Sequence, residues 1–284
     1  MSPPRADAAT SARTWSSVGE GYRRSFATLC AGPVPTLLAH VAPAMERRSA
    51  VLLDVGSGTG TVARAAAGRG WRVLALDPEA DMASMTRDAL NASDEAARVM
   101  RAGLPNLPLT SAGVDAVVAN FVVNHVADPR AALGEAARVV RPGGLLALTI
   151  WTPGSAGWAD LVGAAFEAAD ATAPPSAQLP EHLDFERSPE GLADITRAAG
   201  LFVVVKDRTT WRWRVSPDDL WAGISSGVAA AGARYLAQTP DVRRAVQEHF
   251  VRLEAAEAHD GLLNFASEAT LVVATKPSAP LTST

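Results

Sequence analysis

The sequence predicts an α/β fold built on a doubly wound, mostly parallel sheet, with helical insertions that cap it. Between Val51 and Trp151, apolar runs of strand length alternate with helical patterns, which is the signature of parallel strands joined by crossover helices. The first run, Val51–Val55, passes directly into glycines at every second position, which is typical of a buried strand that breaks into a tight turn. A chain of 284 residues has room for one such domain with insertions.

The N-terminal region is expected to form helices that precede the sheet. Apolar residues spaced by three and four predict a helix from Trp15 to Leu29, and a second helix is expected over Val34–Val41 because Pro43 follows it. We expect residues 1–44 to form a helical lid.

The C-terminal half continues the alternation. Ser188-Pro189 and Ser216-Pro217 each predict a helix start, with Ser as the N-cap and Pro at the first helical position. Strands are expected over Leu201–Lys206 and Ala269–Thr275. The predicted organisation is a lid at 1–44, a core at 45–151, a cap insertion at 152–187, a core helix and strand at 188–215, a helical cap insertion at 216–265, the last core strand at 266–276 and a tail at 277–284.

The turn after the first strand carries the main functional signal. Gly56, Gly58 and Gly60 would let the backbone approach a ligand closely, because glycine has no Cβ. A second apolar run ends in Asp77, and an acid at the tip of the second strand can bind both hydroxyls of a ribose. These features predict a nucleoside-like ligand. Asp77 could also cap a helix that begins near Pro78.

The glycine spacing and Asp54 together narrow the choice of ligand. A dinucleotide site has the pattern G-x-G-x-x-G, whereas here the glycines fall as G-x-G-x-G and Thr61 occupies the third dinucleotide position. A carboxylate at Asp54, just before the turn, would repel a pyrophosphate and suit a ligand with positive charge. S-adenosylmethionine, which has an ammonium group, a sulfonium and a ribose, meets these requirements.

The segment D-V-G-S-G-T-G at 54–60 resembles the first motif of the class I, Rossmann-like S-adenosylmethionine-dependent methyltransferases. Further blocks follow in that family's order and look like the ubiquinone/menaquinone-biosynthesis branch, which includes many small-molecule methyltransferases: Leu107–Leu109, Val114–Asn120, Asn124–Pro129, Arg138–Gly144 and Leu145–Trp151. The resemblance is strong over residues 45–151 and elsewhere covers only the order of elements. It implies a seven-stranded methyltransferase sheet with helical cap insertions.

The resemblance also implies which residues hold the cofactor, S-adenosyl-L-methionine. Asp77 stands at the family's ribose-binding acid, and an N-terminal tyrosine of relatives suggests that Tyr22 closes over the methionine end unless it only packs its helix. Family members often bind adenine through an acid that Met100–Leu104 lacks, so backbone groups there are expected to hold it. The expected cofactor residues are Tyr22, Asp54, Gly56, Gly58, Gly60, Asp77, Pro78, Met82, Gly103, Leu104, Asn120 and Phe121.

Catalytic and acceptor-binding residues are less clearly marked. His125 follows the fourth strand and is a candidate general base, although relatives with diverse substrates carry a histidine there, which favours a structural duty. His182 and four tryptophans in or near the expected lid and caps are candidates for contacting the acceptor: Trp15, Trp151, Trp158 and Trp221. Trp211 and Trp213 either grip a flat substrate or pack one strand face while Arg212 and Arg214 face water.

Composition limits the partners. A net charge of −4 and a pI near 5.8 give no basic surface for nucleic acid. The single cysteine excludes an internal disulfide, and no ligand spacing predicts a metal. We saw no secretory signal or run long enough to span a membrane, so a cytoplasmic monomer or homodimer without a membrane partner is expected.

The sequence therefore predicts an S-adenosylmethionine-dependent methyltransferase. It would transfer the sulfonium methyl group to an O, N or C nucleophile of a small molecule, in secondary metabolism. Two alternatives remain open, namely a protein of this fold that catalyses a cyclisation or rearrangement, and a non-catalytic partner that binds the same cofactor.

Overall fold

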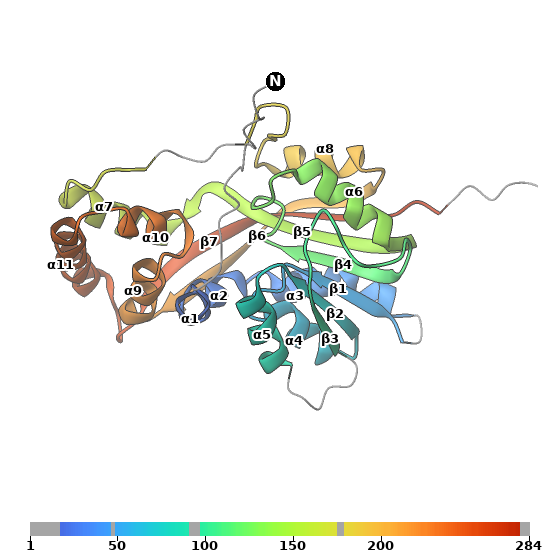
Figure 1. Cartoon of the computed structure of the whole chain (residues 1–284), viewed down its shortest axis with the longest axis horizontal. Coiled ribbons are helices and arrows are strands. Elements are labelled where there is room, and N and C mark those ends of the chain that lie inside the picture. Colours follow the sequence, from blue (N-terminus) through green and yellow to red (C-terminus); the bar gives the residue numbers. More distant parts are fainter. Residues whose placement is uncertain (1–17, 47–48, 91–96, 175–178, 279–284) are drawn as a thin grey trace, which may run out of the picture.

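The computed structural model describes residues 18–46, 49–90, 97–174 and 179–278. A seven-stranded sheet with the order β3-β2-β1-β4-β5-β7-β6 runs through the molecule (Figure 1). All neighbouring strands are parallel except β7, which is antiparallel to both β5 and β6. This confirms the predicted fold class. The strands are β1 Val51–Val55, β2 Arg72–Asp77, β3 Ala97–Arg101, β4 Val114–Asn120, β5 Val140–Ala156, β6 Phe202–Val215 and β7 Leu263–Thr275.

Strand β1 lies at the point where the strand order reverses. Its residue Leu53 pairs with Leu74 of β2 on one side and with Val117 of β4 on the other. Strands β1 and β4 are mostly apolar and are buried along nearly their whole length, as expected for strands covered by helices on both faces. The carboxyl ends of β1, β2 and β4 therefore meet at one edge of the sheet, where open α/β folds bind ligands.

Helices cover the sheet on both faces (Figure 1). One apolar core contains residues of α6 (Pro129–Val139) and α8 (Pro189–Ala198). The other contains residues of α3 (Val34–Val41) and α4 (Thr61–Ala67), and α5 (Ala80–Ala89) lies on the same side. Each face of the sheet thus packs against its own apolar core, and the two cores together hold the residues at the edge of the sheet in place.

The apolar stretch Phe26–Met45 has the length and hydropathy of a membrane-spanning helix. In the fold it is divided into α2 (Phe26–Cys30), α3 and the 3-10 helix η1 (Ala42–Glu46). Leu37 and Leu38 of α3 are fully buried in the core beneath the sheet. The expectation that all of residues 1–44 form a lid is therefore wrong for α3, which is part of the core.

The predicted helix from Trp15 to Leu29 is broken. The described part contains α1 (Gly19–Arg24) and α2, separated by Ser25, whose backbone has φ −112° and ψ −96°. The buried Ser25 hydroxyl donates to the carbonyl of Gly21 at 2.6 Å, and such back-bonding competes with the helical ladder. Trp15 lies outside the described residues.

The cap consists of α7 (Gly157–Ala168), α9 (Pro217–Ser225), α10 (Ala229–Leu236) and α11 (Pro240–Glu257). It gathers at the end of the molecule away from β3 (Figure 1). Ser188 and Ser216 accept N-terminal amide hydrogen bonds of α8 and α9, which confirms both predicted helix starts.

The strands that reach the cap are longer than expected. Pairing of β6 with β7 continues without interruption from Thr209 opposite Ala269 to Val215 opposite Leu263. The last strand therefore begins at Leu263, and residues 263–265 belong to the sheet rather than to the cap insertion that was expected to end at 265. Residues up to Ala156 likewise extend β5 beyond the expected core boundary at 151.

The contact of α1 and α2 with the cap depends on Gly223 in α9. A Cβ at this position would overlap the Ser25 hydroxyl and would lie 2.9 Å from Cε2 of Phe26. Gly223→Ala should lower the free energy of unfolding by about 1–3 kcal/mol, as overpacking does. Gly134→Ala in α6 is the matched control, because nothing lies within 4 Å of its Cβ position. The Gly134→Ala variant should be more stable than the wild type by about 0.5–1 kcal/mol. Urea denaturation measures both, and equal effects would contradict the packing described here.

Candidate active site

The glycine turn after β1 takes a left-handed path. Gly56, Gly58 and Gly60 have φ of +66°, +57° and +82°, a region that side chains rarely adopt. A Cβ at Gly56 would lie 2.6 Å from Cγ2 of Val122, and one at Gly60 would lie 3.0 Å from Cα of Thr86. At Gly58 the nearest atom would be Cε1 of Tyr22, at 3.6 Å. Gly56 and Gly60 therefore serve packing, whereas Gly58 leaves room beside the backbone.

Two hydroxyl groups hold this turn against α5. Ser57 Oγ lies 2.9 Å from Thr86 Oγ1, and the Thr86 hydroxyl is also 2.9 Å from the carbonyl oxygen of Gly58. The Ser57 amide donates to the carbonyl of Leu76 at the end of β2. Thr86 was not identified from the sequence, because its role depends on burial and on contacts with the glycine turn.

Asp54 supports the helix that follows the turn. Its carboxyl group is buried, and Oδ2 accepts the amide of Ala63 in the first turn of α4 at 2.9 Å. Burial raises the pKa of Asp54 from 3.8 to about 8; the Ala63 hydrogen bond opposes the shift and the nearby Asp77 adds to it. Asp54 thus has a structural partner, and its expected contact with a cationic ligand stays a prediction.

Asp77, at the tip of β2, faces the turn. Its carboxylate accepts the amide of Gly58 at 2.8 Å and that of Glu79 at 3.0 Å. Burial raises the pKa of Asp77, while these two hydrogen bonds oppose the rise. The expected helix start at Pro78 is wrong, because α5 begins at Ala80 with Glu79 as N-cap, yet Asp77 does hold an amide there.

Tyr22 of α1 covers the turn. Its ring lies next to Gly58, and its hydroxyl interacts with the thiol of Cys30 in α2. Burial raises the pKa of Tyr22 well above its usual range, and the neighbouring Cys30, Asp77 and Asp54 add to the shift. Burial also raises the pKa of Cys30 to about 12, so both groups stay protonated at neutral pH. No local pattern in the sequence indicated a role for Cys30.

The residues expected at the adenine end also come together. A Cβ at Gly103 would lie 3.2 Å from the ring carbons of Pro78, and Leu104 packs against the α6 and α8 core. Met82 of α5 is buried in a third core together with Val18, which precedes α1. These contacts bring the β2 and β3 ends and the N-terminal helices around the same edge of the sheet.

The segment after β4 joins this region to a set of aromatic rings. Asn120 donates to the carbonyl of Cys30 at 2.8 Å and accepts from the Thr149 hydroxyl at 2.7 Å, so its side chain is engaged by the protein. Phe121 has φ +59°, which is uncommon for a non-glycine residue and is a feature of functional sites. Its ring stacks on Trp151 with centroids 4.0 Å apart.

We call the rings on this side the aromatic cluster, which comprises Phe26, Phe121, Trp151, Trp158, Trp211, Trp213 and Phe265. Trp211 packs on Gly32, and the Trp213 indole donates to Thr28 Oγ1 at 2.8 Å. Arg212 and Arg214 are exposed on the opposite strand face. Trp213 is 3% exposed, which confirms the packing interpretation for it.

Three other candidates lie apart from this group. Trp221 packs on Tyr235 and Phe250 inside the cap. His182 is exposed before α8, and nearby Phe185 packs in the α6 and α8 core, so the structure does not bring His182 to the aromatic cluster. His125 lies in the loop after β4, where its Nε2 is 3.2 Å from Nδ2 of Asn124.

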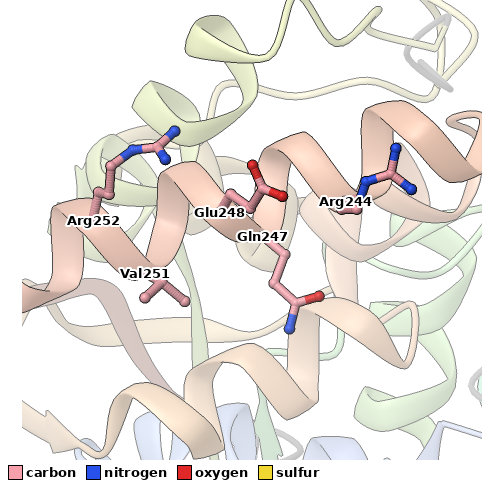
Figure 2. Close-up of a pocket in the computed structure, with 5 residues that line it drawn as sticks. All are labelled: Arg244, Gln247, Glu248, Val251 and Arg252. Carbon is pink, nitrogen blue, oxygen red and sulfur yellow. The ribbon is translucent and has the colours of Figure 1, made fainter.

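Two concave regions of the surface lie away from the glycine turn. One, of about 390 Å³, is formed by residues of α11, at the end of the cap: Arg244, Gln247, Glu248, Val251 and Arg252 (Figure 2). The other is a cleft of about 790 Å³ where the end of β5 and the start of α7 meet β6 and β7. Among the described residues, no three His, Cys, Asp or Glu side chains cluster in a way that could hold a metal ion.

The raised pKa of Asp54 predicts a pH-dependent stability. The folded protein keeps this proton between about pH 4 and pH 8, whereas the unfolded chain releases it, so the free energy of unfolding falls as pH rises through this window. The slope is at most about 1.4 kcal/mol per pH unit. Asp54→Asn keeps a carbonyl oxygen for Ala63 and should remove this slope. Urea denaturation at pH 5.5 and pH 8 measures it, and parallel pH profiles for the two proteins would contradict the assignment.

Comparisons with known proteins agree with this geometry. Residues 53–148 match the family model of the methyltransferase domain. A demethylmenaquinone methyltransferase from Clavibacter sepedonicus is 35% identical over 108 residues, which cover 38% of this chain and 42% of the relative. The match to that curated relative thus spans about two fifths of its length.

Solved structures show the same fold over a larger part of the chain. A candidate methyltransferase from Bacillus halodurans C-125 superposes with a TM-score of 0.53 at 17% identity, covering 86% of this chain and 99% of that one. The [4+2]-cyclase SpnF gives a TM-score of 0.51 at 18% identity and covers 92% and 96%. Residues 53–148 thus match the methyltransferase domain family, and the sheet order together with these solved structures shows the Rossmann-like methyltransferase fold.

Proposed function

We propose that this protein is an S-adenosylmethionine-dependent methyltransferase that methylates an O, N or C nucleophile of a small molecule in secondary metabolism. The observation that carries the proposal is the pairing of Asp77 with the Gly58 amide beneath the ring of Tyr22. A buried acid, a left-handed glycine and an aromatic hydroxyl thus converge at the carboxyl ends of the parallel strands, within a domain that matches the methyltransferase family.

The residues at this edge fit S-adenosylmethionine. Asp77 would accept the ribose hydroxyls, and the space beside Gly58 would admit the nucleoside. Pro78 and Gly103 would flank the adenine, whose polar edge would meet backbone groups. Tyr22 would cover the methionine portion with a hydroxyl that burial keeps protonated and able to donate. When bound, the cofactor supplies an electrophilic methyl group.

The remaining residues would position the acceptor. Val122 lies against the glycine turn while its neighbour Phe121 stacks on Trp151, so the cofactor site and the aromatic cluster are adjacent along one chain segment. An acceptor held there would be aligned for an in-line displacement, and alignment alone can lower a barrier by about 7–11 kcal/mol. The apolar rings would exclude water from the reaction.

Two other functions remain as outcomes of the test. The structure of the [4+2]-cyclase SpnF has this fold, so the fold alone does not specify methyl transfer. A cyclase-like enzyme would turn over without forming S-adenosylhomocysteine. A non-catalytic partner would bind the cofactor, show no turnover and need a second protein. Formation of S-adenosylhomocysteine that depends on the acceptor supports our proposal over both.

Cofactor binding tests the proposed site directly. Asp77→Asn removes a charged acceptor, and hydrogen bonds to charged groups contribute about 1.5–3 kcal/mol each. The affinity for S-adenosylmethionine in isothermal titration calorimetry should therefore fall at least tenfold. Asp194→Asn on the exposed surface of α8 is the control and should bind as the wild type does. Unchanged affinity in Asp77→Asn, with an intact fold by circular dichroism, would show that the ribose lies elsewhere.

The contribution of His125 tests how the rate arises. If alignment dominates, His125→Ala should lower kcat by less than about a hundredfold, because a dedicated general base contributes about 10²–10⁴. Steady-state formation of S-adenosylhomocysteine gives kcat. A larger loss, with unchanged cofactor affinity and a pH–rate profile that loses its acidic limb, would instead identify His125 as the base.

A further inference from the structure

Unpaired polar atoms are concentrated on the aromatic cluster and its neighbour Ser267. Among the described residues, the indole nitrogens of Trp158 and Trp211 and the hydroxyl of Ser267 are buried and have no hydrogen-bond partner. A buried donor without a partner is costly, and native proteins contain few of them. Apart from these, the described chain has only Trp71 Nε1 and Asn124 Oδ1 in this state.

Two of these atoms come from paired positions of adjacent strands. Trp211 of β6 lies directly opposite Ser267 of β7, so their side chains share one face of the sheet. Trp211 lies near the stacked pair Phe121 and Trp151, with ring centroids 6.3 Å and 6.1 Å away. Apolar ring faces and unused donors therefore occur together on one surface.

Trp211 and Ser267 both line the cleft of about 790 Å³, with Nε1 of Trp211 and Oγ of Ser267 themselves buried behind its surface. The mouth of this cleft carries charges of both signs, including Asp160, Arg212 and Arg208, which pairs with Glu268 at 3.2 Å. Arg212 alternates with the tryptophans along β6 and is exposed on the other face. The lining of the cleft thus combines ring faces and neutral polar groups with charged side chains of both signs.

We propose that the acceptor is a planar, uncharged molecule whose hydrogen-bond-accepting oxygen binds the Trp211 indole N–H and the Ser267 hydroxyl while its rings pack on the aromatic cluster. This inference rests on the proposed function only where it calls the bound molecule an acceptor. Binding of the molecule at this site does not depend on methyl transfer. The oxygen would satisfy donors that the protein leaves without partners, and stacking on Trp and Phe rings would select flat molecules.

Two bicyclic probes of similar shape test the donors. Coumarin has a carbonyl oxygen, and naphthalene has no polar atom. Equilibrium dialysis with and without S-adenosylhomocysteine gives the dissociation constant of each, and comparison between proteins cancels the different hydrophobicity of the probes. Trp211→Phe should weaken coumarin binding by roughly three- to tenfold, which corresponds to one neutral hydrogen bond, and change naphthalene binding by less than about twofold.

Further variants make the test specific. Ser267→Ala should also weaken the binding of coumarin and not that of naphthalene. Because this substitution removes less volume, it still tests the donors if Trp211→Phe is poorly folded. Trp71→Phe is the matched control, because its indole nitrogen is also buried and unpaired but lies before β2, at the opposite end of the strand from Asp77. It should change neither probe.

Several outcomes would overturn the inference. The first is that coumarin shows no measurable binding up to its solubility limit, and the second is that Trp211→Phe weakens the binding of both probes equally. The third is that 2-naphthoate binds more tightly than 2-naphthol, which would indicate an anionic ligand held by Arg212. Calorimetry with S-adenosylmethionine keeps the two proposals distinct. Cofactor binding without selective loss of coumarin in the variants overturns only this inference, and selective loss without cofactor binding overturns only the proposed function.

Discussion

The left-handed turn that follows β1 is the constraint on which the rest of the site depends. The chain has to leave a fully buried strand and enter α4 within a few residues, and it passes so close to Val122 and Thr86 that side chains are excluded at two of the three glycines. This path presents the Gly58 amide to Asp77 and brings the end of β1 against the ends of β2 and β4. The residues that pack around the turn are therefore positioned by its backbone path.

The N-terminal helices connect the two halves of the site. Tyr22 lies on the turn, the carbonyl of Cys30 accepts from Asn120, and Thr28 accepts from the indole of Trp213. The short segment α1–α2 therefore contacts the glycine turn and the aromatic cluster through different residues. The break at Ser25 lets the chain bend between these contacts, which a single straight helix would not allow.

Patterns that are local in the sequence predicted most of the fold. The order of the strands, the two Ser-Pro helix starts and the glycine turn are encoded by neighbouring residues, and each was found at its expected place. The break at Ser25 was missed because it depends on a hydroxyl that folds back on Gly21. The early start of β7 was missed because strand length there is set by pairing with β6, far away in sequence.

Local patterns in the sequence indicated only part of the arrangement at the candidate site. Asp77 and the glycines could be recognised from spacing, whereas the roles of Thr86 and Cys30 depend on contacts across the fold. Asp54 was interpreted by its charge, yet its burial and its bond to Ala63 could be seen only once α4 was placed over it. Unpaired donors such as Trp211 have no sequence signature at all, since they are defined by what surrounds them.

The antiparallel ribbon formed by β6 and β7 has a consequence for how such proteins diversify. The residues proposed to hold the cofactor lie mainly at the carboxyl ends of β1, β2 and β3, whereas Trp211 and Ser267 lie on the last two strands in the chain. The short segment Asn120–Val122 touches both groups, since Val122 lies against Gly56 and Phe121 lies near Trp211. Substitutions in β6, β7 and the cap can therefore accumulate during evolution without altering the residues proposed to hold the cofactor.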